Sequence, residues 1–239
     1  MVDDPARFDI PLYTVAEAGR YLGVPTSTFT TWAYGYTRRP PGGAPVHGEP
    51  IVTVRPRTTP GGAVVPFIGL AEGLILAAIR RAGVPLQRIR PALTRLADEL
   101  GIDHVLASHA LYTDGAEVLY DFAEHHGDTP EARSARELVA VRHGQRVFGE
   151  IVDSYLQRVE FAADGYARLI RLPQYQHASV VVDPSRGFGQ PIFSHGGARL
   201  EDVLGRFQAG EPLAEVAAEF GVPATDLEDA VRIAARPAA

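Results

Sequence analysis

The sequence predicts an α+β protein with three parts, residues 1–100, 101–177 and 178–239. Three observations support this prediction. Apolar residues recur at helical spacing, beside capping residues, near both ends of the chain. Glycine-containing turns between β-forming residues lie in the middle. The composition, with 46% hydrophobic and 22% charged residues, is that of a globular protein.

The first part begins with two short helices joined by a tight turn. Thr14 is a good N-cap, and Glu17 stands at the position that completes a capping box. Gly23 ends the first helix, where a left-handed residue costs least. A second helix is expected over Thr26–Tyr34, with Phe29 and Trp32 directed inward. This arrangement predicts a helix-turn-helix.

The outer face of the second helix carries small hydroxyl side chains, and two arginines follow the helix. Such groups reach phosphates and base edges in a DNA major groove. The alternative is a helical hairpin used only for packing. The candidate DNA contacts here are Ser27, Thr28, Thr31, Arg38 and Arg39.

A β-hairpin is expected next, with strands over 51–55 and 63–67 around a turn at Pro60-Gly61-Gly62. A hairpin behind a helix-turn-helix is a wing, and wings contact the flanking backbone or the minor groove. Arg55 and Arg57 would lie on this wing and complete the candidate DNA contacts.

The charge distribution places nucleic-acid contact near the start of the chain. The net charge is -6, yet residues 1–97 hold 11 arginines and 6 acids. Residues 98–131 hold 9 acids and no arginine. Because a DNA-binding surface must attract phosphates, the N-terminal part is the best candidate for it.

The remaining elements follow from periodicity and turn residues. Helices are expected over 70–81, 86–100, 148–159, 200–207 and 213–220, with a last helix capped by Thr225. Hairpins are expected over 111–120 and 138–148, and strands over 167–172 and 179–182.

The sequence argues against an enzyme. It has no cysteine and no lysine, and it lacks the common catalytic and phosphate-binding motifs. His125 and His126 adjoin two acids, which we interpret as a chance loop cluster. We therefore predict no catalytic residue, no metal site and no cofactor. No apolar run reaches membrane-spanning length and the first residues are unlike a signal peptide, so a cytoplasmic protein is expected.

The third part predicts another helix-turn-helix, but residues 209–239 hold 6 acids and 2 arginines. Phosphates would be repelled by such a surface. We therefore expect this module to bind protein or to dimerise, with DNA contact as the alternative.

The order of the parts resembles a known family. The segment from Tyr13 to Tyr34 resembles the DNA-binding head of MerR-type regulators. The segments from Gly189 to Val203, Gly210 to Val222 and Leu227 to Arg232 are similar to the small helical domain of VapB-type antitoxins, apart from Ala198 and Leu200, where Thr and Ile are usual. With the stretch from Leu74 to Arg90, the chain resembles the longer antitoxins of this group.

The resemblance implies a VapC-type toxin partner, a PIN-domain ribonuclease that holds Mg²⁺ with acidic residues. It also implies binding to operator DNA as an autorepressor. Arg232 and Arg236 are the candidate toxin contacts by position, because a guanidinium forks onto carboxylates. A homodimer is expected, since helix-turn-helix proteins usually read paired half-sites. The alternatives are a stand-alone MerR-like transcription regulator with a small-molecule ligand, and an adaptor that binds only protein.

Overall fold

The structure, a computed structural model, describes residues 4–39, 42–82, 94, 96–113, 129, 132–133, 141–142, 145–146, 155 and 157–235. The N-terminal part contains α1 (Pro5–Phe8), α2 (Val15–Leu22), α3 (Thr26–Tyr34), β1 (Tyr36–Arg38), β2 (Val46–Gly48) and α4 (Phe67–Arg81). The middle contains η1 (Val105–Ala107), α6 (Ala110–Thr113), β3 (Val141–Arg142) and β4 (Gln145–Arg146). The C-terminal part contains β5 (Val159–Phe161), β6 (Ala167–Arg171), β7 (Val180–Val182), η2 (Gly187–Gly189), β8 (Ile192–Phe193), α10 (Leu200–Gln208), α11 (Leu213–Glu219) and α12 (Ala224–Ala234).

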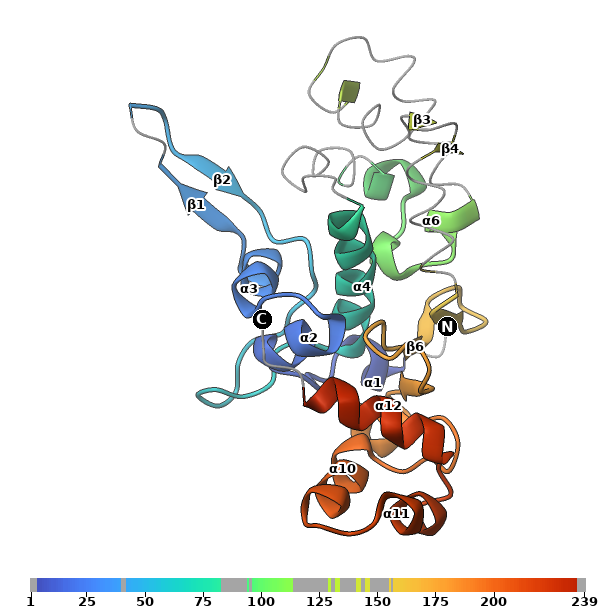
Figure 1. The fold of residues 1–239 in the computed structure, drawn as a ribbon. Helices are drawn as coiled ribbons and strands as arrows, with labels where there is room; N and C mark the ends of the chain where they lie inside the picture. The colour runs from blue at the N-terminus through green and yellow to red at the C-terminus, as the bar shows by residue number, and fades with distance from the viewer. Residues whose placement is uncertain are drawn as a thin grey trace.

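Helix α4 forms the centre of the molecule (Figure 1), and every residue from Phe67 to Ile79 is buried. Helices α1 and α2 pack against it. Leu22 of α2 and Phe29 of α3 approach α4 closely because Gly73 has no side chain: a Cβ there would lie 2.7 Å from Phe29 and 2.9 Å from Leu22. A helix that is apolar on all sides belongs in a core, and here the whole N-terminal part is built around it.

Strands β5, β6, β7 and β8 form an antiparallel sheet in chain order. Ile170 of β6 pairs with Val182 of β7, and Val181 pairs with Ile192 of β8. All three residues of β7 are buried, as expected of a strand that is covered on both faces. The sheet links the N-terminal part to the C-terminal helices.

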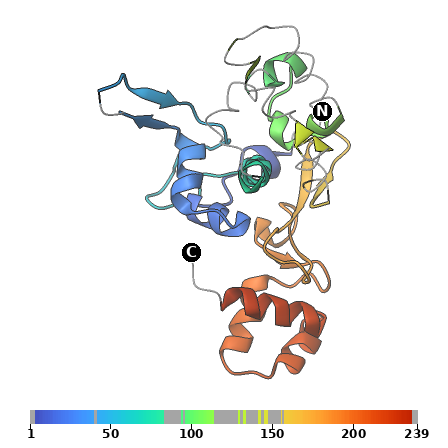
Figure 2. The same cartoon turned by 45° about the horizontal axis from the view of Figure 1, so that its top comes forward.

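Helices α10, α11 and α12 form a separate group beyond the sheet (Figure 2). Their apolar faces meet at Val203, Val216 and Leu227, each 0% exposed. Two acids of α12 fasten this group to the sheet. Asp229 accepts hydrogen bonds from the backbone N–H groups of His177 and Ala178, and Asp226 accepts one from Ser179.

The structure confirms the α+β class and many of the predicted elements. Thr14 caps α2 within a capping box, and Gly23 ends the helix with φ of 66°. The residues on either side of the predicted turn, Val141–Arg142 and Gln145–Arg146, form the antiparallel pair of β3 and β4. Helices α10 and α11 and strands β6 and β7 lie within one residue of their predicted ranges.

Several predictions of local structure need correction. Leu111–Thr113 belong to helix α6, because the strand-like bridge forms earlier, between Ser108 and Tyr166. Helix α4 covers the whole predicted range 70–81 but begins three residues earlier, at Phe67, directly after Pro66. Val159 lies in strand β5, so no helix extends to it.

Thr225 does not cap α12, contrary to the prediction. The N-cap is Pro223, whose carbonyl accepts hydrogen bonds from the N–H groups of Asp226 and Leu227, so the helix begins at Ala224. Residues 86–93, 114–120 and most of the predicted helix over 148–159 lie outside the described residues.

Candidate nucleic-acid interface

Helices α2 and α3 form the predicted helix-turn-helix. Val24 in the turn is buried, and so are Phe29 and Trp32 on the inner face of α3. The turn is tight: its backbone comes so close to α2 that a Cβ at Gly19 would lie 3.0 Å from the Val24 carbonyl oxygen. Aromatic packing between Phe29 and Trp32, with ring centroids 5.8 Å apart, fixes the orientation of α3 on the core.

The hydroxyl groups on α3 differ in their availability. Thr31 donates a hydrogen bond to the Ser27 carbonyl, at 3.0 Å, so its proton is used within the helix. The hydroxyls of Ser27 and Thr28 make no hydrogen bond to another described residue. Ser27 is exposed, whereas Thr28 and Thr31 are half-buried. Ser27 and Thr28 are therefore the ready donors on this face.

The hairpin of β1 and β2 follows α3 directly and projects away from the body of the molecule (Figures 1 and 2). Its register pairs Tyr36 with Gly48 and Arg38 with Val46. Arg38 and Arg39 are exposed, and neither forms an ion pair with another described residue. Two unpaired guanidinium groups on a projecting arm can neutralise phosphates without first breaking an internal contact.

The predicted wing over 51–55 and 63–67 was wrong as a strand pair. The N–H groups of Ile51 and Val52 donate to the Trp32 carbonyl at the end of α3. Val65 forms an isolated bridge with Tyr13. The β-branched residues of this stretch therefore attach a loop to the core. The loop's backbone N–H groups need acceptors, and the ends of helices and strands offer unsatisfied carbonyl groups.

Arg55 and Arg57 nevertheless lie beside α3. Together with Tyr34, at the end of α3, they line an open hollow of about 640 Å³; the other lining residues are Val54, Pro56 and Val64. Arg55 forms an ion pair with Asp9, at 2.9 Å, whereas Arg57 is exposed and forms none with another described residue. Tyr34 is 48% exposed and was not among the predicted contacts.

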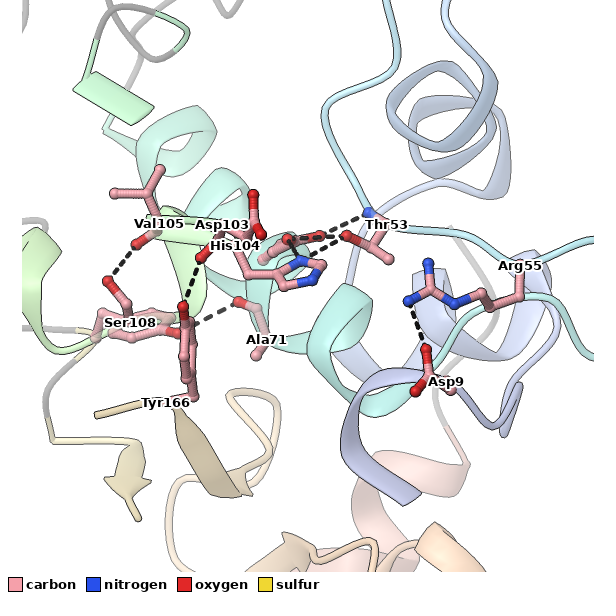
Figure 3. Close-up of polar contacts among 11 residues, drawn as sticks. Asp9, Thr53, Arg55, Ala71, Asp103, His104, Val105, Ser108 and Tyr166 are labelled. Carbon is pink, nitrogen blue, oxygen red and sulfur yellow. Dashed lines mark hydrogen bonds and ion pairs between the residues drawn. The ribbon is translucent and has the colours of Figure 1, made fainter. Parts of the chain in front are cut away.

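A half-buried polar cluster around the buried Glu72 supports the loop that carries these arginines (Figure 3). The carboxylate of Glu72 in α4 accepts hydrogen bonds from the N–H of Thr53, at 2.6 Å, and from its hydroxyl, at 3.0 Å. His104 Nδ1 lies 2.9 Å from the same carboxylate. Glu72 was not among the predicted functional residues, although a single acid inside an otherwise apolar helix is a usable signal.

More acidic side chains of the C-terminal helices than expected have partners within the protein. Arg206 pairs with both Glu211 and Glu219. Asp229 is buried against backbone N–H groups. We therefore predicted too much negative charge for this surface, because several of its carboxylates already have partners within the protein.

The two predicted toxin contacts differ in what the structure describes. Arg232 is exposed and pairs with Glu228 one turn earlier, at 3.0 Å. Arg236 lies outside the described residues.

The helix-turn-helix and the C-terminal part are in direct contact. The Tyr13 hydroxyl donates to the Gly189 carbonyl at 2.8 Å, and the Tyr21 hydroxyl donates to the Gln190 side chain at 3.0 Å. Burial raises the pKa of the Tyr13 phenol well above its ordinary value, so it remains a donor at neutral pH. The contact joins α2 to the turn that contains η2.

In the described ranges no three His, Asp or Glu side chains gather as metal ligands would; His125 and His126 lie outside these ranges. None of the described helices combines the length and apolar character that a bilayer crossing requires.

Two family models match the chain. One, described as "Putative DNA-binding HTH domain", matches residues 11–93 and so includes the helix-turn-helix, the hairpin and α4. The other, described as "Protein of unknown function (DUF433)", matches residues 180–234.

Relatives occur in Mycobacterium tuberculosis (strain ATCC 25618 / H37Rv). The chain is 53% identical to "Putative antitoxin VapB45" over 226 residues, which cover 94% of both proteins. It is 27% identical to "Uncharacterized protein Rv2308", with 95% of this chain and 91% of that protein covered. The crystal structure of Rv2018 from Mycobacterium tuberculosis matches with a TM-score of 0.80 and 50% identity, over 94% of this chain and 99% of that one.

Proposed function

The chain belongs to the VapB45 antitoxin family, and on this premise we propose that it neutralises a VapC-type PIN-domain ribonuclease and binds operator DNA as an autorepressor. In this proposal it acts as a homodimer, is not an enzyme and needs no cofactor. Because operator DNA would be bound in the cytoplasm, the proposal also implies a cytoplasmic protein.

One observation carries the DNA-binding half of the proposal. The hydroxyls of Ser27 and Thr28 and the guanidinium groups of Arg38, Arg39 and Arg57 lie on adjoining elements, and no other described residue occupies them. Hydroxyls at the start of a recognition helix reach base edges and phosphates, while arginines that follow it neutralise phosphates. Arg55 and Thr31 would first have to exchange an internal partner.

The toxin-binding half rests on the relative's name and on the chemistry of the C-terminal end. We propose that Arg232 and Arg236 contact carboxylates of the ribonuclease. The side chain of Arg232 is 67% exposed, so its pair with Glu228 is screened by water and is easily exchanged for a carboxylate of a partner.

A co-purification experiment tests the proposal. The chain is co-expressed with the product of the adjacent gene and analysed by size-exclusion chromatography and a ribonuclease assay. A stable complex in which the neighbour's ribonuclease activity is lost would support the antitoxin function. If the chain does not bind the product of the adjacent gene but shifts its own promoter DNA, the antitoxin function is contradicted and a DNA-binding regulator remains.

The proposed toxin contacts are tested in the same complex. The double variant with Arg232→Ala and Arg236→Ala should restore part of the ribonuclease activity, because the guanidinium groups would no longer occupy the acidic site of the ribonuclease. Inhibition that stays complete in this double variant would remove both residues from the proposed contact.

A further inference from the structure

Phe188 is the most exposed of the large apolar side chains that the structure describes, with 88% of its surface accessible. It lies in η2, in the turn where the C-terminal part touches α2. Its ring has no aromatic or cation–π partner among the described residues. An exposed apolar side chain alone is common on protein surfaces, so exposure does not by itself indicate function.

The backbone at Phe188 makes this exposure unusual. Its φ and ψ are 56° and 32°, in the left-handed region, and Gly187 and Gly189 also have positive φ. A non-glycine residue in this region costs about 1–3 kcal/mol. Glycine or asparagine would relieve that cost and suit a solvent-exposed turn. Neither the turn conformation nor core packing therefore explains a phenylalanine here.

The turn is also held rigidly. A Cβ at Gly187 would lie 2.9 Å from Ile192, and one at Gly189 would lie 2.7 Å from Leu12. The Gly189 carbonyl accepts the hydrogen bond from Tyr13. Asp183 further fixes the turn, since it accepts hydrogen bonds from the N–H and the hydroxyl of Ser185. A rigidly presented aromatic ring is what a protein-binding anchor requires, because little conformational entropy is lost on binding.

The charge beside the ring indicates the chemistry of the partner. Arg186 is exposed and forms no ion pair with another described residue. The nearby Arg199 already faces Glu201 at 3.8 Å and Asp202 at 3.9 Å. Arg186 thus leaves a positive charge two residues from the ring, which favours carboxylates on the partner's side.

We propose that Phe188 and Arg186 form a docking surface for a protein that offers an apolar pocket bordered by carboxylates. This inference rests on the proposed function, in which that protein is the ribonuclease encoded by the adjacent gene. A second copy fits less well, because a two-fold contact centred on Phe188 would bring both Arg186 side chains together. A DNA backbone offers no apolar pocket for the ring.

The test measures the affinity of the full-length chain for the purified adjacent-gene product, its melting temperature and its oligomeric state. Phe188→Asn should weaken the affinity about 30-fold, as loss of a central aromatic anchor does. The melting temperature of this variant should stay unchanged or rise, because the left-handed backbone conformation costs less free energy with asparagine than with phenylalanine. Phe188→Tyr keeps the ring and should retain the affinity. Arg186→Glu should weaken it about 10-fold, more strongly at low salt.

Val46→Asn is the matched control, since Val46 is also an exposed apolar residue but lies on the β1–β2 hairpin. It should leave the affinity for the ribonuclease unchanged. If the wild-type complex forms and Phe188→Asn binds equally well, the docking surface is wrong while the antitoxin function stands. If the variant loses only self-association, the surface is a homodimer contact and our proposal is overturned. If the wild type forms no complex, the proposed function fails and the docking surface with it.

Discussion

At the scale of single residues, Thr14 shows how much a local signal can decide. Its hydroxyl accepts a hydrogen bond from the Glu17 N–H at 3.1 Å, and the Glu17 carboxylate accepts one from the Thr14 N–H at 2.8 Å. Both contacts join residues three apart, so the sequence alone was sufficient to predict them. Contacts of this kind do not depend on the rest of the fold.

We predict that Thr14→Ala lowers the free energy of unfolding by about 1 kcal/mol, because an N–H group at the start of α2 loses its acceptor. Urea denaturation followed by circular dichroism measures this change. Thr30→Ala is the control, because Thr30 is exposed and its hydroxyl bonds, among the described residues, only to the Thr26 carbonyl within α3. It should change the free energy by less than about 0.5 kcal/mol. Equal losses in the two variants would contradict the role of the cap.

Glu72 shows the limit of reasoning from single residues. Its partners Thr53 and His104 lie 19 and 32 residues away in sequence. A buried carboxylate must be satisfied by hydrogen-bond donors, but the sequence does not say which segments supply them. Only the packing of α4 against the 51–57 loop and η1 identifies these partners.

At the scale of elements, glycines in helices have opposite roles that their sequence context does not reveal. A Cβ at Gly69 in α4 would lie 2.3 Å from the Thr53 carbonyl oxygen, whereas a Cβ at Gly205 in α10 would meet no atom of the described residues within 4 Å. The first glycine permits a close approach between helix and loop. The second merely weakens its helix.

We therefore expect two alanine substitutions to change stability in opposite directions. Gly69→Ala should lower the free energy of unfolding by about 1–3 kcal/mol, because backbone atoms must move to make room. Gly205→Ala should raise it by about 0.5–1 kcal/mol, because alanine restricts the unfolded chain and favours helix. Thermal denaturation of both variants measures the two changes. A gain in stability for Gly69→Ala would show that the close approach is not needed.

The β1–β2 hairpin is the element on which the proposed DNA contact depends most. We predict that replacing Arg38→Ala and Arg39→Ala together weakens operator binding and makes it less dependent on salt. Each lost phosphate contact should reduce the slope of log K against log salt concentration by about 0.9. Fluorescence anisotropy with promoter DNA over a salt series measures this slope.

Arg168→Ala with Arg171→Ala provides the matched control. Both residues are exposed on β6, in the sheet, and the double substitution changes the net charge equally. It should leave the slope unchanged. If both double variants reduce the slope alike, the effect reflects total charge, and the placement of DNA on the hairpin is wrong.

At the scale of the whole molecule, an ion pair joins the first helix to the C-terminal sheet. The buried guanidinium of Arg7 in α1 bonds to both carboxylate oxygens of Asp164, which lies in the turn between β5 and β6. The hydrogen bonds from Arg7 lower the pKa of Asp164 below its ordinary value of 3.8. The charged form is therefore favoured by folding.

This pair predicts a pH-dependent difference between the wild type and Asp164→Asn. A lowered pKa in the folded state stabilises the fold above the ordinary pKa and loses that effect as pH falls through the folded value. The wild type should be the more stable at pH 7, and the difference should shrink as the pH falls below 3.8. Chemical denaturation at a series of pH values measures it. A difference that stays constant down to low pH would exclude this ionic contribution.

The sequence by itself determined the α+β class, the helix-turn-helix with its cap at Thr14 and its turn at Gly23, and the resemblance to VapB-type antitoxins. These features depend on contacts within a few residues or on the order of segments. The tertiary structure decided which strands form the hairpin, the partners of Glu72 and Asp229, and the strained exposure of Phe188. Such features depend on packing between distant segments, where burial and unsatisfied backbone groups override local propensity.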